Sequence, residues 1–238
     1  MSRIGVFGGM GPSATVDFMD KLVQLTPAAR DQEHVPVIVA SLPHIPDRSR
    51  AILGQGLDPL PRLLEGISFL NGAGVGVIAI PCNSSHHWYR EMSEASQVPI
   101  LHIAQACVAA IGGEPGQQVA IFATRGALAS GIYQRELEAR GIGYFEPHPD
   151  TGQPWVDACI REVKAGDMAA SGHSLGKAIA AARAQGATSV IMACTEIPVA
   201  ARHTEAQGLR LIDSSLELAR ASIGYAVERG WNRPGWPC

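Results

Sequence analysis

Two cysteines stand where apolar, β-branched stretches of the chain give way to small polar residues. Cys82 follows the stretch 75–80 (VGVIAI), and Cys194 follows 188–193 (TSVIMA). This pattern predicts a buried strand that ends near a thiol and leads into a helix. A helix N-terminus lowers the pKa of a thiol from its reference of about 8.5 and also holds an anion such as a carboxylate. Both cysteines are therefore candidates for an active site.

Two thiols that face each other suit a reaction that needs a proton acceptor and a proton donor on opposite faces of one carbon. That reaction is racemisation, in which one thiolate removes the α-hydrogen and the opposite thiol returns a proton to the other face. We expect the pair to share one proton, so that its titration belongs to both residues. Asp47 in a proline-rich segment and Glu196 two residues after Cys194 are the carboxylates expected to help set that state.

No catalytic role is expected for the other three cysteines. Cys107 and Cys159 lie on apolar faces of expected helices, where a free cysteine acts as a small buried hydrophobe, and Cys238 is expected to be exposed. The five cysteines form no CxxC pair and no short Cys/His spacing of the kind that zinc requires, so we expect no metal site. Free thiols are typical of a reducing compartment and predict a cytoplasmic protein.

Composition excludes several classes of partner. The 238 residues include 19 basic and 22 acidic side chains, for a net charge of −3, and only 5% are aromatic. With no basic block, neither nucleic acid nor an anionic membrane is expected to bind. No uninterrupted apolar stretch is long enough to span a bilayer, and the N-terminus (MSRIGVFGG) lacks the pattern of a secretory leader.

The sequence pattern predicts two copies of one α/β arrangement of strands and helices. The first copy begins with a strand, a glycine turn and a helix at 13–25. After the glycine-rich segment 112–116 (GGEPG) the pattern starts again with a strand at 119–122 and a polar turn at 123–130. Alternating strands and helices predict an α/β fold of two pseudo-symmetric domains, each a parallel-rich sheet flanked by helices, with the active site in the cleft between them.

The first domain is expected to comprise residues 1–103, completed by a C-terminal helix within 213–238, and the second to comprise 104–212. The last helix is expected to pack back on the first copy. The expected strands or extended segments are 3–7, 35–40, 75–80, 99–103, 119–122, 143–149, 189–192 and 209–212, and the expected helices are 13–25, 57–71, 84–96, 104–111, 156–165, 173–185 and 214–229. Prolines make 41–50 (SLPHIPDRSR) a predicted loop, and the tail 230–238 is predicted to be a surface flap.

The turn after the first strand (GMGPSA) formally matches the dinucleotide fingerprint G-x-G-x-x-A. However, the second strand ends in VAS without the acidic residue that binds a ribose, and Pro12 lacks an N–H to cradle phosphate. We therefore expect no nucleotide. The turn is expected instead to bring Gly11, Ser13 and Thr15 toward a small anionic ligand. The guanidinium of Arg48 is expected to bind a carboxylate of that ligand.

Four motifs in register resemble the aspartate/glutamate racemase superfamily, and within it the aspartate racemase branch. They are GGMGPSAT (8–15), IPDRS (45–49), PCNSSH (81–86) and ACTEIP (193–198), and they span nearly the whole chain. The resemblance implies two pseudo-symmetric α/β domains, a homodimer, and catalysis without PLP, metal or nucleotide. Its two catalytic cysteines fall on Cys82 and Cys194.

The resemblance also implies a set of substrate-binding residues. Arg48 is implied to grip a side-chain carboxylate, with Lys164 as a second cation, and Met10 of the first motif is expected to line the substrate site. The residues implied to hold the α-carboxylate and amino group are Asn83, Ser84, Thr124 and Thr195.

One motif departs from the family pattern. The usual PCNTAH reads PCNSSH here, which keeps a hydroxyl at Ser84 and adds a polar group at Ser85 that is expected to change the pocket. His86 and His87, which follow, are interpreted as capping, packing or facing solvent rather than as bases or metal ligands.

The sequence therefore predicts a PLP-independent racemase that interconverts L- and D-aspartate, or glutamate. The presence of both thiols argues against the single-cysteine decarboxylase relatives. Two alternatives stay open: a maleate-type cis–trans isomerase with Cys82 as covalent nucleophile, and a non-catalytic protein that binds an amino acid.

Overall fold

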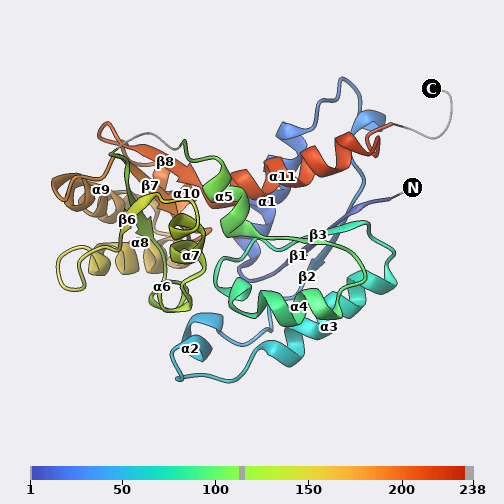
Figure 1. Ribbon diagram of the computed structural model, residues 1–238, viewed down its shortest axis with the longest axis horizontal. Helices are drawn as coiled ribbons and strands as arrows, with labels where there is room; N and C mark the ends of the chain where they lie inside the picture. Colours follow the sequence, from blue (N-terminus) through green and yellow to red (C-terminus); the bar gives the residue numbers. More distant parts are fainter. Residues whose placement is uncertain (1, 113–115, 234–238) are drawn as a thin grey trace.

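The structure, a computed structural model, describes residues 2–112 and 116–233. It contains two four-stranded sheets in which every pair of neighbouring strands is parallel (Figure 1). The first sheet has the order β2-β1-β3-β4 and the second the order β6-β5-β7-β8, so the second repeats the first. The strands are β1 (Ile4–Gly8), β2 (Val37–Ser41), β3 (Val77–Ala79), β4 (Ile100–Leu101), β5 (Gln118–Phe122), β6 (Gly143–Phe145), β7 (Ser189–Met192) and β8 (Arg210–Asp213). The predicted fold of two similar α/β halves is confirmed.

Helices cover both faces of each sheet, which is why the central strands are apolar on both sides. In β5, Phe122 packs with α8 and α9 while Ile121 packs with α5 and α7. In the first half, α3 and α4 cover one face and α1 and α11 the other. The helices are α1 (Pro12–Leu25), α2 (Arg48–Ile52), α3 (Leu60–Gly72), α4 (Tyr89–Ala95), α5 (Ile103–Ala109), α6 (Arg125–Ser130), α7 (Ile132–Glu138), α8 (Gln153–Ala165), α9 (Met168–Ala184), α10 (Ile197–Ala201) and α11 (Ser214–Glu228), with 3-10 turns η1 (Asp31–Glu33) and η2 (Ser84–Trp88).

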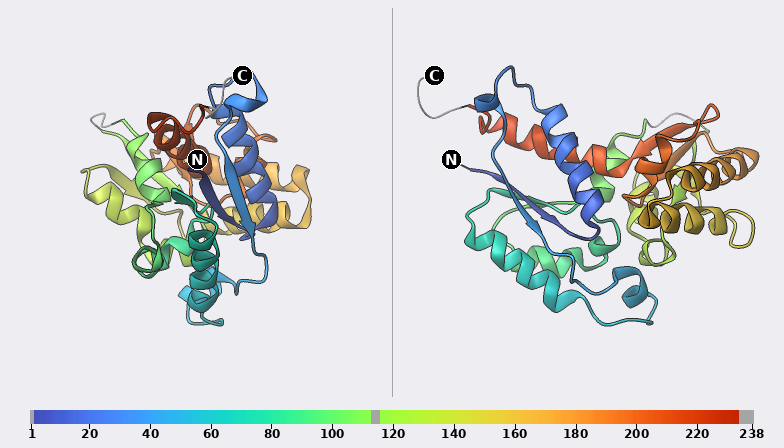
Figure 2. Two further views of the ribbon diagram at one scale, coloured as in Figure 1. Left: turned by 90° about the vertical axis from the view of Figure 1, so that its right-hand side faces the viewer. Right: turned by 180° about the vertical axis from the view of Figure 1, so that it is seen from behind.

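The last helix returns to the first sheet, as predicted. Leu218 and Ile223 of α11 are buried against Ile4 of β1 and Phe18 of α1. Figures 1 and 2 show α11 running beside α1, away from the second sheet. The predicted division of the chain at residue 103 stays a prediction.

Several predicted elements were wrong in type or extent. The segment 41–50, predicted as loop throughout, ends in helix α2, because the Asp47 carboxylate accepts a hydrogen bond from the Arg50 N–H and caps the helix. The predicted turn at 123–130 contains α6, which Thr124 caps in the same way. The predicted helix 84–96 is a 3-10 turn followed by α4, and α7 and α10 were not predicted. Residues 113–115 of the predicted linker and 234–238 of the predicted tail, with Cys238, lie outside the described residues.

Polar side-chain contacts connect the two halves across the boundary between them. The Ser49 hydroxyl in α2 lies 3.1 Å from the Thr124 hydroxyl. On α1, the buried Lys21 amino group lies 2.6 Å from the carboxylate of Asp213, which is the last residue of β8 and caps α11. Arg202, just after α10, lies 2.6 Å from Asp17 on α1. These contacts hold the second half against α1 and α2 of the first.

Gly66 allows α3 to pack closely on β1, which leads to a test of the fold. A Cβ at Gly66 would lie 2.2 Å from the ring of the fully buried Phe7. We expect Gly66→Ala to lower the free energy of unfolding by about 1–3 kcal/mol, because the ring or the helix must move. Gly72→Ala, in the last turn of the same helix, meets no atom within 4 Å and serves as the control. Equal denaturation midpoints for the two variants would contradict the close approach.

Candidate active site

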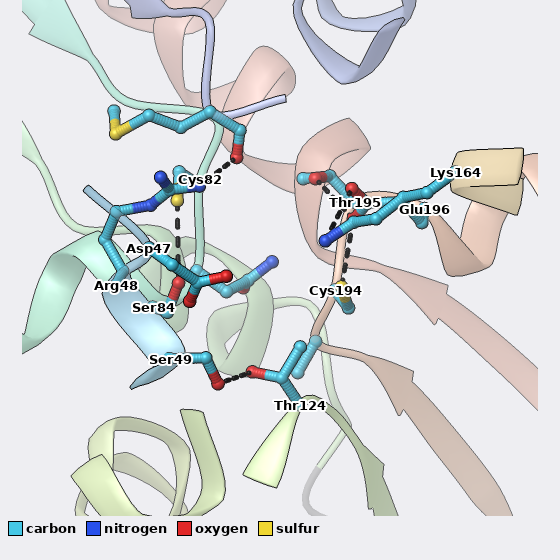
Figure 3. A pocket seen from close by; sticks show the side chains of 13 residues that line it. Asp47, Arg48, Ser49, Cys82, Ser84, Thr124, Lys164, Cys194, Thr195 and Glu196 are labelled. Carbon is cyan, nitrogen blue, oxygen red and sulfur yellow. Dashed lines mark hydrogen bonds and ion pairs between the residues drawn. The ribbon is translucent and has the colours of Figure 1, made fainter. Parts of the chain in front are cut away.

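Cys82 and Cys194 lie at the carboxyl ends of corresponding strands. Each strand, β3 and β7, is the third in its sheet, and ligands of parallel α/β sheets bind at that edge. The two thiols lie on opposite sides of one cavity of about 50 Å³ (Figure 3). This volume holds only a few waters, so the cavity suits a small ligand. It is lined by Met10, Asp47, Arg48, Ser49, Cys82, Asn83, Ser84, Thr124, Lys164, Ala193, Cys194, Thr195 and Glu196.

The backbone at Cys82 is held by the two residues that complete the PCNSSH motif. The carbonyl oxygen of Cys82 lies 2.8 Å from the Ser85 hydroxyl, which donates to it, and 2.9 Å from Nδ1 of His86. Its sulfur lies 3.7 Å from the hydroxyl of Ser84. Ser85 is fully buried and is not among the residues that line the cavity, so any effect on the pocket acts through its contact with Cys82.

His86 is a structural histidine. Its Nε2 accepts a hydrogen bond from the Ile103 N–H at 3.2 Å, so its Nδ1 carries the proton that is donated to Cys82. Burial, with a smaller effect of His102, lowers the pKa of His86 to about 3. The ring is therefore neutral at physiological pH. His87 packs its ring against Trp88 and is exposed.

Cys194 lies in a different electrostatic environment from the one predicted. Its sulfur donates a hydrogen bond to the Glu196 carboxylate at 3.0 Å, and Glu196 in turn lies 3.8 Å from the Lys164 amino group. Burial, followed by the negative charge of Glu196, raises the pKa of Cys194 well above its ordinary value, against a smaller lowering by Lys164. The predicted net lowering of the pKa was wrong: the backbone N–H of Glu196, just before α10, does lower it, but burial and the Glu196 carboxylate outweigh that effect. Cys194 rests as a thiol.

Charged groups of both signs converge on the cavity from the two halves. Asp47 and Arg48 come from the first half, and Lys164 and Glu196 from the second (Figure 3). The Arg48 guanidinium is held in place by the carbonyl oxygens of Ile45, Pro46 and Met10, each at 3.1 Å. Two cations and two anions around a small space suit a zwitterion better than a polyanion.

Asn83 lines the cavity, but its side chain also joins the two halves. Its Nδ2 donates to the Ser214 hydroxyl at 3.2 Å, and its Oδ1 accepts a hydrogen bond from Tyr133. Ser214 donates to the carbonyl of Met192 at 2.8 Å. Tyr133 and Ser214 were not found by sequence reasoning, since neither stands near a motif. Ser49, which also lines the cavity, was missed although it lies within the IPDRS motif.

The glycine turn contributes less to this cavity than predicted. The Thr15 hydroxyl accepts from the Gly9 N–H at 2.8 Å and donates to the Gly11 carbonyl at 3.0 Å, so it holds the turn and not a ligand. Gly11 and Ser13 line a neighbouring cavity instead. The remaining predicted residues, Met10, Arg48, Ser84, Thr124, Lys164 and Thr195, are brought together around the two thiols as expected.

The described ranges 2–112 and 116–233 contain no group of three or more His, Cys, Asp or Glu side chains arranged to hold a metal ion. Within the same ranges, none of the helices has the length and apolar character needed to cross a membrane.

The fold is shared with amino-acid racemases. The chain is similar to the solved structure of an aspartate racemase from Picrophilus torridus, with 30% identity, 95% of each chain covered and a TM-score of 0.85. A glutamate racemase from Francisella tularensis shares the fold at 16% identity, with 99% of this chain and 84% of that chain covered and a TM-score of 0.73.

Sequence comparison defines the family. Residues 7–221 match the family described as Asp/Glu/Hydantoin racemase, and the chain belongs to that family. It is also 29% identical to the broad specificity amino-acid racemase RacX of Bacillus subtilis, over 92% of this chain and 96% of that protein. The resemblance seen in the four motifs is confirmed at the level of the family.

The carboxylate beside Cys194 leads to a prediction about its reactivity. Glu196→Gln removes a charge that disfavours the thiolate, so the pKa of Cys194 falls and its alkylation by iodoacetamide at pH 8 becomes faster, by up to about tenfold for each unit of pKa change. Mass spectrometry of the Cys194 peptide measures this rate in the variant, with the wild-type protein under the same conditions as control. An unchanged rate would show that Glu196 does not govern the thiol.

Proposed function

We propose that this protein is an amino-acid racemase that uses Cys82 and Cys194 as the two acid–base groups of a cofactor-independent reaction. The observation that carries the proposal is the position of the two thiols on opposite sides of one small cavity, each at the end of a strand in its own sheet. A group on each face of a carbon is what inversion by proton transfer requires.

For one direction of turnover, the protonation state of Cys194 suggests which thiol starts as the proton donor and which as the base. Cys194, held as a thiol by burial and by Glu196, is the proton donor, and Cys82 as thiolate removes the α-hydrogen from the opposite face. The C–H electron pair stays on Cα and then takes the proton from Cys194. The reaction ends with the proton on Cys82 and a thiolate at Cys194, which is the starting state for the opposite enantiomer. The pair thus carries one proton between its two members.

The groups around the thiols support an acidic amino acid as substrate, aspartate before glutamate. Arg48 and Lys164 are cations for its carboxylates, and Asp47 and Glu196 favour the ammonium group. The hydroxyls of Ser84, Thr124 and Thr195, with Asn83 and Met10, complete the substrate site. The names of the relatives, an aspartate racemase and a broad specificity amino-acid racemase, support the same class of substrate.

The family resemblance supports three further proposals about the whole protein. The chain divides into residues 1–103, completed by helix α11 within 213–238, and residues 104–212. It acts as a homodimer, and it works in the cytoplasm.

Substitution of either thiol tests the two-base reaction. We expect Cys82→Ala and Cys194→Ala each to lower racemisation of aspartate by at least about 1000-fold, because each removes the acid or base from one face. Proton NMR in deuterated water, with chiral chromatography, follows loss of the α-proton and inversion of L- and D-aspartate without added cofactor. Cys159→Ala, a buried thiol outside the cavity, is the matched control.

Three outcomes would contradict the proposal. Turnover at the wild-type rate by either single variant excludes the two-base reaction. A covalent adduct of maleate mass on Cys82, without racemisation of aspartate, assigns the chain as a cis–trans isomerase. Tight binding of aspartate with neither exchange nor inversion assigns it as a binding protein.

A further inference from the structure

A second cavity adjoins the one between the two thiols. It has a volume of about 220 Å³, against about 50 Å³ for the catalytic cavity. Lys164, Thr195 and Glu196 line both cavities, so these residues form the wall between them. Nothing in the two-thiol reaction on aspartate uses this larger space.

The lining of the second cavity is mainly apolar or small. The start of α1 contributes Gly11, Pro12, Ser13 and Ala14, the end of α8 contributes Val163, and α10 contributes Val199. Apart from the shared wall, none of the described residues that line it is charged. Pockets of this composition take uncharged groups, and polar atoms at their rim set the orientation.

Only a weak ion pair holds the side chain of Lys164 in the wall between the two cavities. The Lys164 amino group lies 3.8 Å from the Glu196 carboxylate, and the Lys164 side chain is 57% exposed. An exposed ion pair at this distance adds little to stability, so the side chain of Lys164 is free to swing aside. On the other side, Gly11 has no side chain, and a Cβ there would lie 3.7 Å from the Glu196 carboxylate. The absent side chain keeps a gap open between α1 and Glu196.

We propose that the second cavity is a subsite for the side chain of a neutral, unbranched amino acid such as methionine or norleucine. This inference rests on the proposed racemase function and extends it to uncharged substrates. The α-carbon stays between Cys82 and Cys194, and the side chain passes between Gly11 and Lys164 into the apolar space. Lys164 therefore has two positions: paired with the carboxylate of an acidic side chain, or turned outward to admit a neutral one.

The proposal predicts a dependence on side-chain length. Each methylene buried in an apolar site strengthens binding about fourfold. Wild-type kcat/KM should therefore rise from alanine to 2-aminobutyrate, norvaline and norleucine, until the cavity is filled. Chiral chromatography of each amino acid after incubation with the wild-type protein gives this series.

Filling the cavity tests its role. Ser13→Phe places a ring at its rim from an exposed position on the first turn of α1, and Val199→Phe fills it from α10. For each variant we expect the ratio of kcat/KM for methionine to kcat/KM for aspartate to fall at least tenfold. Val16→Phe, the same change at a 71% exposed position of α1, is the control that keeps the ratio. Thermal melting of all three variants checks that each is folded.

The outcomes separate this inference from the function on which it rests. A wild-type protein that racemises aspartate but none of the neutral series overturns the subsite and leaves the racemase proposal standing. Racemisation of methionine with an unchanged ratio in both folded Phe variants also overturns the subsite. Absence of inversion for every amino acid overturns the proposed function itself.

Discussion

The relation between the two thiols depends on a short chain of buried hydrogen bonds across the boundary between the halves. Asn83, next to Cys82, donates to Ser214, and Ser214 donates to Met192, two residues before Cys194. A buried polar group left without a partner costs about 1–3 kcal/mol, so these side chains hold their positions firmly. The two thiols are thus linked through side chains as well as through the fold, and Tyr133 fixes the amide of Asn83 from the second half.

Charge around the two thiols is unequal, although the sheets repeat each other. Cys194 donates to a carboxylate, whereas the Cys82 sulfur lies 3.7 Å from the neutral hydroxyl of Ser84. The repeated architecture therefore supplies equivalent positions, and local side chains make the two positions chemically different. Both signs of charge are needed in the cavity, because an amino acid carries both. A similar balance of opposite charges recurs outside the site, where Lys21 lies between two carboxylates.

The strand ends and the cysteines that follow them were predictable because burial on both faces of a parallel strand leaves a continuous apolar run in the sequence. The resemblance to the racemase family then predicted that Arg48, Ser84, Thr124 and Lys164 lie near the thiols. What sequence reasoning missed depends on contacts between distant residues. Ser214 is an ordinary helix-start serine until folding brings Asn83 to it. Likewise, the raised pKa of Cys194 results from burial and from the orientation of Glu196, and neither follows from spacing.

The return of α11 to the first sheet has a mechanical consequence. The chain crosses between the halves twice, once before α5 and once between β8 and α11, and α5 and α11 pack against each other. The two covalent connections between the halves therefore lie side by side, and a shift of one half relative to the other has to move α5 and α11 together.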